Sequence, residues 1–140
     1  MAEKFKIITQ FVKDMSSETP NVETYLYVKE YIKNYNLNIE ITTKPLKNRM
    51  IEVNTKLNYM DKGKSKNKSH FEMNYASIIK IDEEIKDRNI IEKIILCDVQ
   101  KEIYPSLEKI FINLLSSSGF DNIKFEKKID FEKLYKEKFN

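Results

Sequence analysis

The sequence has little of the chemistry on which enzymes and metal sites depend. Its 140 residues include no tryptophan, one cysteine, Cys97, and one histidine, His70. Cys97 has no partner for a disulfide within the chain, and a lone thiol is typical of a reducing compartment, so the sequence predicts a cytoplasmic protein. His70 has no second histidine or thiol with which to bind a metal ion. We therefore expect no enzymatic activity, no metal and no cofactor.

Glycine, proline and long apolar runs are also scarce. Two glycines and three prolines leave little material for disordered linkers, and an apolar fraction of 41% is enough for a core, so we expect one domain over residues 1–140. No apolar run approaches the roughly 20 residues of a membrane helix. The first ten residues, MAEKFKIITQ, alternate in polarity and lack the apolar core of a signal peptide.

The excess of positive charge is confined to one short segment. The chain has 25 basic and 22 acidic residues, and residues 61–69 (DKGKSKNKS) hold four of the lysines and one of the acids. The remainder then has 21 of each, which leaves no net charge. This distribution favours a solvated hairpin loop over a nucleic-acid-binding surface.

Alternation of apolar and polar residues predicts four β-strands, at residues 4–15, 37–43, 50–60 and 70–81. In the first strand, Phe5, Ile7, Thr9 and Phe11 are expected on one face and Ile8, Gln10, Val12 and Asp14 on the other. Consecutive strands joined by short turns pair antiparallel, and one face of such a sheet is covered while the other stays polar.

Residues 22–36 (VETYLYVKEYIKNYN) have four tyrosines in fifteen positions and no clear period. One interpretation is a short amphipathic helix or an extended segment that covers one edge of the core. The other is an aromatic rim to a binding surface. The sequence favours neither.

Three helical patterns follow the fourth strand. Residues 85–103 come after three acids, at 82–84, that suit the start of a helix. Residues 104–119 carry a broad apolar stripe, with Pro105 either beginning a second helix or kinking one long helix, and Gly119 ending it. Asp130 is the expected N-cap of a short helix at residues 131–139. The sequence therefore predicts an α+β fold, a four-stranded antiparallel sheet packed with a long helix and a shorter C-terminal helix.

Aromatic side chains are abundant for a chain of this length. Tyrosine and phenylalanine together number sixteen, and several, such as Tyr25, Tyr27, Phe120 and Phe125, fall at element ends or in connectors. Some of these belong to the core. A surplus would indicate self-association or an apolar binding surface.

Four segments, in order and at similar spacing, resemble the SecB family of bacterial protein-export chaperones. They are residues 5–21 (FKIITQFVKDMSSETPN), 71–81 (FEMNYASIIKI), 104–120 (YPSLEKIFINLLSSSGF) and 130–135 (DFEKLY). The resemblance covers nearly the whole chain. It implies an ATP-independent holdase that keeps precursor proteins unfolded in the cytoplasm and delivers them to the SecA motor.

The resemblance also implies roles for particular residues. It implies a homotetramer, a dimer of dimers with the long helices in the contact, here Leu107, Ile110, Phe111 and Leu114. An acidic patch that receives SecA is expected at Asp14, Glu18 and Glu72. An apolar client-binding groove is expected from Phe71, Met73, Tyr75, Tyr25, Tyr27, Phe120, Leu134 and Tyr135.

Two alternatives to a general export chaperone remain open. The chain could be a SecB-like chaperone dedicated to one client, such as an antitoxin. It could also be a small-molecule-binding protein that uses an aromatic pocket. Binding to nucleic acid and insertion into a membrane are not expected.

Overall fold

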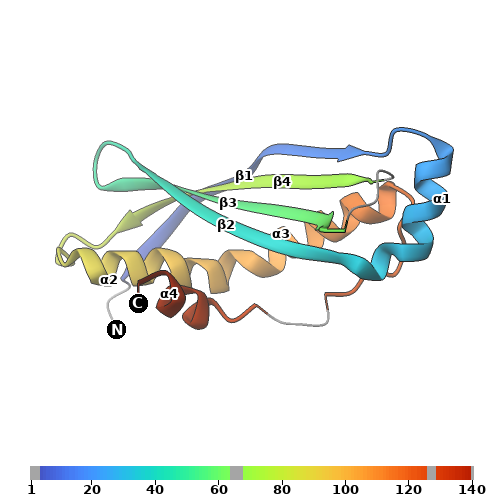
Figure 1. The fold of residues 1–140 in the computed structure, drawn as a ribbon. Coiled ribbons are helices and arrows are strands. Elements are labelled where there is room, and N and C mark those ends of the chain that lie inside the picture. The colour runs from blue at the N-terminus through green and yellow to red at the C-terminus, as the bar shows by residue number, and fades with distance from the viewer. Residues whose placement is uncertain (1–3, 64–67, 126–128, 140) are drawn as a thin grey trace.

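The computed structural model describes residues 4–63, 68–125 and 129–139. It contains a four-stranded antiparallel sheet with the strand order β1-β4-β3-β2, covered on one face by helices (Figure 1). The strands are β1 (Phe5–Glu18), β2 (Tyr35–Pro45), β3 (Met50–Asp61) and β4 (His70–Ile81). This arrangement confirms the predicted fold class. Because β1 crosses over to pair with β4, the two edges of the sheet are β1 and β2.

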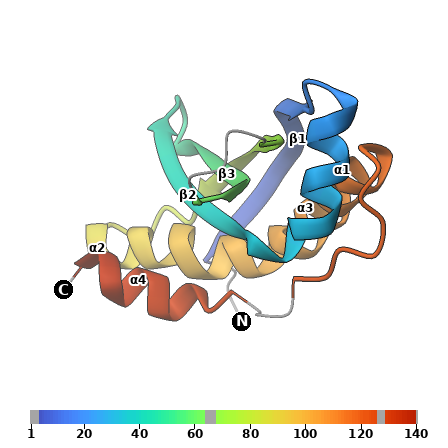
Figure 2. The same ribbon diagram turned by 45° about the vertical axis from the view of Figure 1, so that its right-hand side comes forward.

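One long helical segment lies under the sheet along its length (Figures 1 and 2). It comprises α2 (Arg88–Lys93), a single π turn, η2 (Ile94–Asp98), and α3 (Val99–Ser117). The other helices are α1 (Val22–Tyr31), which continues into the 3-10 turn η1 (Ile32–Asn34), and α4 (Phe131–Phe139). Helix α1 lies at one end of the sheet, and α4 lies beside the long helix near the other end (Figure 2).

The structure shows where the helices begin and end, which the sequence left open. Residues 22–31 form a helix, with the Asn21 side chain accepting a hydrogen bond from the Thr24 N–H at 2.8 Å. Pro105 lies inside α3, so residues 88–117 form one helical segment. The acids at 82–84 do not start a helix as predicted. Asp82 instead accepts the Glu84 N–H in a tight turn, and Asp87 is the N-cap of α2.

The core lies between the inner face of the sheet and the long helix. On β4, alternate residues from Phe71 to Ile81 are buried, as the alternation predicts. On α3, the fully buried residues Leu107, Phe111 and Leu115 are spaced four apart and lie on one face of the helix. Strands β3 and β4 are the two central strands, and their inner faces are buried except at Ile51, which is half-buried near the start of β3.

Strand β1 differs from its predicted pattern. Two β-bulges, between Ile7 and Thr9 and between Val12 and Asp14, each insert one residue. The alternation is reset at each bulge. Phe5 and Ile7 therefore share the inner face with Gln10 and Val12, whereas Thr9 and Phe11 lie on the outer face, opposite Ile78 and Ala76.

The lysine-rich segment, residues 61–69, connects β3 to β4 as predicted. Its central residues, 64–67, lie outside the described part of the chain. At its ends, the Gly63 N–H donates to Asp61 at 2.8 Å, and the Ser69 N–H donates to the Tyr35 hydroxyl at 2.9 Å.

Candidate functional site

A groove with an apolar lining runs between the edge strand β2 and helix α4. Its volume is about 480 Å³. Ile39 and Ile41, which point inward from β2, are half-buried, and Leu96 of the π turn is almost completely buried. Leu134 and Tyr135 of α4 line the groove from the other side. The remaining lining residues are Glu40, Thr42 and Glu137.

Helix α4 is held against the π turn and the start of α3 by one buried ring and two polar contacts. The Phe131 ring is buried and packs edge-on against Tyr104, with 5.6 Å between ring centroids. The buried Cys97 thiol donates to the Phe131 carbonyl at 3.5 Å. On the surface, Lys101 pairs with Glu132 at 3.1 Å and lowers the pKa of that carboxyl. These contacts hold α4, which forms one wall of the groove, against the long helix.

Cys97 is a structural residue in this arrangement. Burial raises the pKa of its thiol, so the thiol stays protonated at neutral pH. A protonated, buried thiol is a poor nucleophile.

The end of the sheet near α1 holds a cluster of aromatic rings. Tyr25 packs against Phe120 at 5.2 Å, and Phe120 packs edge-on against Phe71 at 5.5 Å. The Tyr25 hydroxyl donates to the Gly119 carbonyl at 2.8 Å, which joins α1 to the end of α3. Tyr27 is half-buried and contacts Tyr31 within α1, with 4.6 Å between centroids. The cluster continues through Tyr35, Tyr59, Phe111 and Phe125.

Half of the residues predicted for the groove lie in the core of the chain. Phe71, Met73, Tyr75 and Phe120 are buried, because the long helix covers the sheet face on which the strand residues lie. They form the core beneath the surface and are not an open lining. Tyr25 and Tyr27 are partly exposed at the α1 end, whereas Leu134 and Tyr135 line the groove beside β2.

Sequence reasoning missed three groove residues, Ile39, Ile41 and Leu96. The alternation of β2 places Ile39 and Ile41 on the inner face, but it does not say that β2 is an edge strand with α4 beside it. Leu96 lies in the π turn, whose presence the apolar spacing does not reveal.

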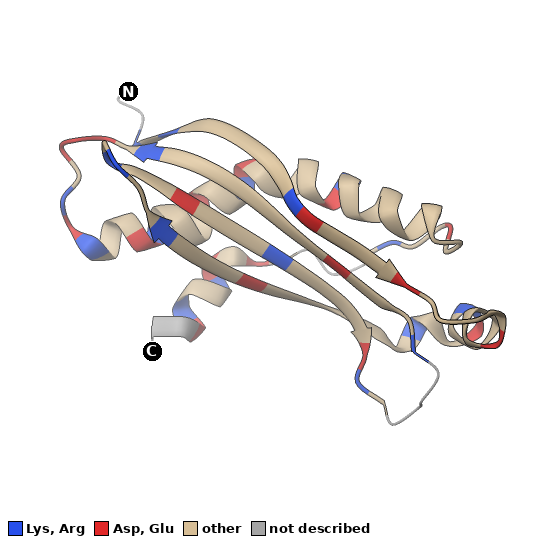
Figure 3. Cartoon of the chain, turned by 90° about the horizontal axis from the view of Figure 1, so that it is seen from above, with Lys and Arg blue, Asp and Glu red and all other residues tan. Residues whose placement is uncertain are grey.

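The three predicted SecA-binding acids share the outer face of the sheet. On β1, Asp14 pairs with Asn74 and Glu18 pairs with His70, and Glu72 lies between these two β4 positions, opposite Ser16. Other charges of both signs are spread over this face (Figure 3). Lys13, at a bulge of β1, reaches Glu52 of β3 at 2.8 Å and lowers the pKa of that carboxyl. The three acids lie toward the end of the sheet that is near α1.

The residues expected at the oligomer contact divide into two groups. Leu107 and Phe111 are fully buried in the chain's own core, because they face the sheet, so they offer no surface to a second copy. Ile110 and Leu114 are half-buried. The largest exposed apolar side chains of the sheet lie on β1, at Ile8, Phe11, Val12 and Met15.

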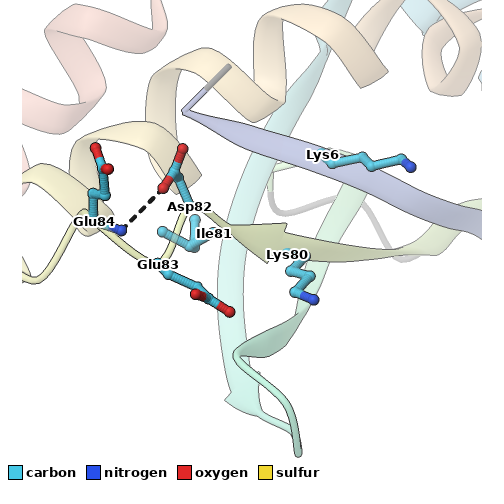
Figure 4. A pocket seen from close by; sticks show the side chains of 6 residues that line it. All are labelled: Lys6, Lys80, Ile81, Asp82, Glu83 and Glu84. Atoms are coloured by element: carbon cyan, nitrogen blue, oxygen red, sulfur yellow. Dashed lines mark hydrogen bonds between the residues drawn. The ribbon is translucent and has the colours of Figure 1, made fainter. Parts of the chain in front are cut away.

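A second cavity, of about 360 Å³, is charged (Figure 4). Lys6 and Lys80, which are cross-strand partners, line it together with Ile81 and the turn at residues 82–84. Among the residues that the structure describes, no three histidine, cysteine, aspartate or glutamate side chains are grouped to hold a metal ion. The apolar groove is therefore the better candidate for a functional site.

Comparison with known proteins identifies the family of the chain. The family model described as "Preprotein translocase subunit SecB" matches residues 1–140. The chain belongs to the SecB family. A relative from Pelagibacter ubique, named "Putative protein-export protein SecB", is 55% identical over 140 residues, with both chains covered completely. SecB of Parvibaculum lavamentivorans is 23% identical over 137 residues, which cover 98% of this chain and 80% of that protein.

Among solved structures, this SecB-family chain is similar to a SecB-like chaperone of Mycobacterium tuberculosis in complex with a ChAD peptide from an antitoxin. The TM-score is 0.64 with 9% sequence identity, and the match covers 89% of this chain and 91% of the other. At this identity the likeness concerns the fold. Over the described residues of this SecB-family chain, no helix is both long enough and apolar enough to span a membrane.

Proposed function

We propose that the chain is an ATP-independent holdase that keeps precursor proteins unfolded in the cytoplasm and delivers them to SecA. Its 140 residues act as one chaperone domain without catalytic activity. The observation that carries this proposal is the apolar groove between β2 and α4, on a chain of a protein-export family. Client segments bind there through Ile39, Ile41, Leu96, Leu134 and Tyr135.

Binding in this groove depends on burial of apolar surface. Transfer of apolar surface out of water contributes roughly 25 cal/mol per Å², and the contribution has no preferred direction, so many client sequences are accepted. Folded proteins bury their own apolar side chains and are therefore not bound. Two carboxylate residues, Glu40 and Glu137, are among those that line the groove, so basic residues beside the apolar ones favour binding.

The aromatic cluster near α1 is proposed as a second part of the client site. Tyr25 and Tyr27 present partly exposed rings there, and Phe120, which packs on Phe71, supports the Tyr25 ring from the core. Met73 and Tyr75 lie in the same core layer and have a supporting role. Two separate contacts along one client add avidity to individually weak binding.

The working form is proposed to be a homotetramer, a dimer of dimers. Its support is the exposed apolar surface of β1, an edge strand whose backbone groups can pair with another chain. Ile110 and Leu114 of α3 contribute the helical part of the contact.

SecA is proposed to dock on the outer face of the sheet. Asp14, Glu18 and Glu72 lie there on neighbouring strands, on the face opposite the one that α3 covers. This placement lets the chain bind SecA and a client simultaneously. The three carboxylates complement a basic segment of SecA.

The groove is tested by replacing Leu134 with aspartate. A charge in the apolar lining must be desolvated when a client binds, so affinity is expected to fall at least tenfold. The probe is a reduced and carboxymethylated small protein that cannot refold, titrated by isothermal calorimetry. Leu134 is 40% exposed in the free chain, so the variant is expected to fold.

Ile90→Asp is the matched control. Ile90 is 46% exposed on α2 and is not among the residues that line the groove. The control should bind the probe as the wild type does. Equal affinities for Leu134→Asp and wild type would show that the groove is not the client site.

A further inference from the structure

The π turn of the long helix determines which side chain faces the groove. In this turn the Val99 N–H donates to the carbonyl of Ile94, five residues back. Four consecutive side chains, Ile94 to Cys97, are buried. Ile94, Ile95 and Leu96 belong to the core cluster that includes the strand residues, and the turn also contacts α4. Leu96 lines the groove, whereas the thiol of the next residue contacts the Phe131 carbonyl of α4. Isolated π turns in helices are frequently found at functional sites.

A fully buried amide connects this turn to the sheet. The Gln100 side chain donates from Nε2 to the Ile95 carbonyl, inside the turn, at 3.5 Å. Its Oε1 accepts a hydrogen bond at 3.1 Å from the hydroxyl of Thr55 on β3. Thr55 is also completely buried. A sheet residue is therefore linked through one side chain to a carbonyl of the turn.

The polar pair has no evident packing purpose. Burying an amide and a hydroxyl costs free energy that their hydrogen bonds only offset, and two apolar side chains of similar shape would fill the same space. What the pair adds is a directional link. Its two hydrogen bonds, from Thr55 to Gln100 and from Gln100 to the Ile95 carbonyl, together fix the position of that carbonyl relative to β3. The adjacent residue, Leu96, is fixed with it.

We infer that Gln100 and Thr55 are positioning residues for client binding, which hold the π turn so that Leu96 faces the groove. The inference rests on the proposed client groove. Without the amide, the turn is free to take ordinary helical hydrogen bonds. A shift of one residue along a helix rotates a side chain by about 100°, which would turn Leu96 away from β2 and α4.

The test is the double variant Thr55→Val with Gln100→Met. Both side-chain partners become apolar, so neither is left as an unpaired buried group. The Ile95 carbonyl loses its Gln100 donor, and in an ordinary helical turn it accepts the Val99 N–H instead, so the thermal midpoint should stay within about 4 °C of wild type. Affinity for the reduced, carboxymethylated probe should fall at least fivefold. In addition, the NMR signals of the Leu96 methyl groups should shift on addition of the probe in the wild type but not in the double variant.

Gln10→Met is the matched control. It removes the amide that accepts the Tyr75 hydroxyl at 2.8 Å, on the inner face of β1 and away from the π turn. It should leave the response of the Leu96 methyl groups to the probe unchanged. Thr55→Ser keeps the hydroxyl and should behave as wild type, whereas Thr55→Val alone should weaken binding. This pair decides the question if the double variant does not fold.

The outcomes separate the inference from the proposed function. Wild-type affinity in the double variant, with Leu134→Asp still defective, would overturn the positioning role and leave the groove in place. Weaker binding with a normal Leu96 response would also overturn it, because the turn would not have moved. If Leu134→Asp bound the probe with wild-type affinity, the groove proposal would be wrong, and the positioning inference, which depends on it, would also be wrong.

Discussion

Gly119 is the residue whose identity the backbone constrains most directly. Its φ is +96°, and a Cβ atom there would lie 2.7 Å from Cε2 of Tyr25. We expect Gly119→Ala to destabilise the protein by about 1–3 kcal/mol, because the left-handed backbone is strained for alanine and the Tyr25 ring must move. Urea unfolding at one fixed protein concentration measures this loss.

Gly63→Ala is the control for that measurement. A Cβ atom at Gly63 would meet only the flexible carboxylate of Asp61, at 3.1 Å, and its φ lies outside the left-handed range. Its effect should stay within about 0.5 kcal/mol. Equal losses for the two variants would contradict the role assigned to the Tyr25 contact.

Glu72 tests the proposed docking of SecA on the outer face. We expect Glu72→Lys to weaken SecA binding about tenfold and to reduce its dependence on salt, because one attractive charge becomes repulsive. Surface plasmon resonance at several ionic strengths measures both effects. Client affinity should not change, because Glu72 points away from the helix-covered face.

Glu83→Lys makes the same change of charge at the other end of the molecule. Glu83 is exposed in the turn after β4 and lines the charged cavity (Figure 4). If Glu83→Lys weakened SecA binding as much as Glu72→Lys does, the loss of affinity would be caused by the change in net charge. The patch at Asp14, Glu18 and Glu72 would then not be the docking site.

At the scale of elements, the strands were predictable wherever burial follows a period of two. Strands β3 and β4 are central, so every second side chain is covered, and their alternation correctly gave their inner faces. In β1 the same reasoning put Thr9 and Phe11 on the wrong face. A bulge adds one residue without changing composition, so nothing in the sequence of β1 marks where the alternation is reset.

In the long helix, too, periodicity predicted only part of the structure. Its apolar stripe was predicted to pack against the sheet, and Leu107, Phe111 and Leu115 of this stripe are buried there, whereas Ile110 and Leu114 are half-buried. The π turn at Ile94–Asp98 was not predictable, because four adjacent apolar residues fit a buried α-helix equally well. Gln100 also gave no signal, since a single glutamine in a helix is normally at the surface.

Periodicity could place candidate site residues on a face of their own helix or strand, but it could not show which faces lie side by side in the fold. Helical spacing placed Leu134 and Tyr135 on one side of α4, and they line the groove. Alternation placed Phe71, Met73 and Tyr75 on one face of β4, but whether that face is open or covered depends on where the long helix packs. The groove requires β2 to be an edge strand with α4 beside it, which is a property of the tertiary fold.

At the scale of the whole molecule, the two edges of the sheet differ in character. Beside β2 lies α4, which contributes one wall of the groove. At the other edge, β1 leaves Val12 38% and Met15 43% exposed on the face that packs against α3. Under the proposed function, the β2 edge binds the client and the β1 edge binds a second copy of the chain, so the two proposed contacts use different surfaces.

This division predicts the effect of charge on assembly. We expect the double variant Val12→Lys with Met15→Lys to dissociate the proposed tetramer into smaller species, because lysines on an edge strand oppose pairing with another strand and are costly to bury. Native mass spectrometry of the isolated protein gives the oligomeric state directly. Both residues are exposed within one chain, so each subunit is expected to keep its fold.

Val22→Lys with Leu26→Lys provides the comparison. These two residues of α1 are more exposed, at 68% and 60%, and lie on a helix at the end of the sheet. If exposed apolar area alone drove assembly, this variant would dissociate at least as readily as the β1 variant. If the β1 edge is the contact, it stays tetrameric. A β1 variant that remained a tetramer would place the interface elsewhere, with Ile110 and Leu114 of α3 the next positions to change.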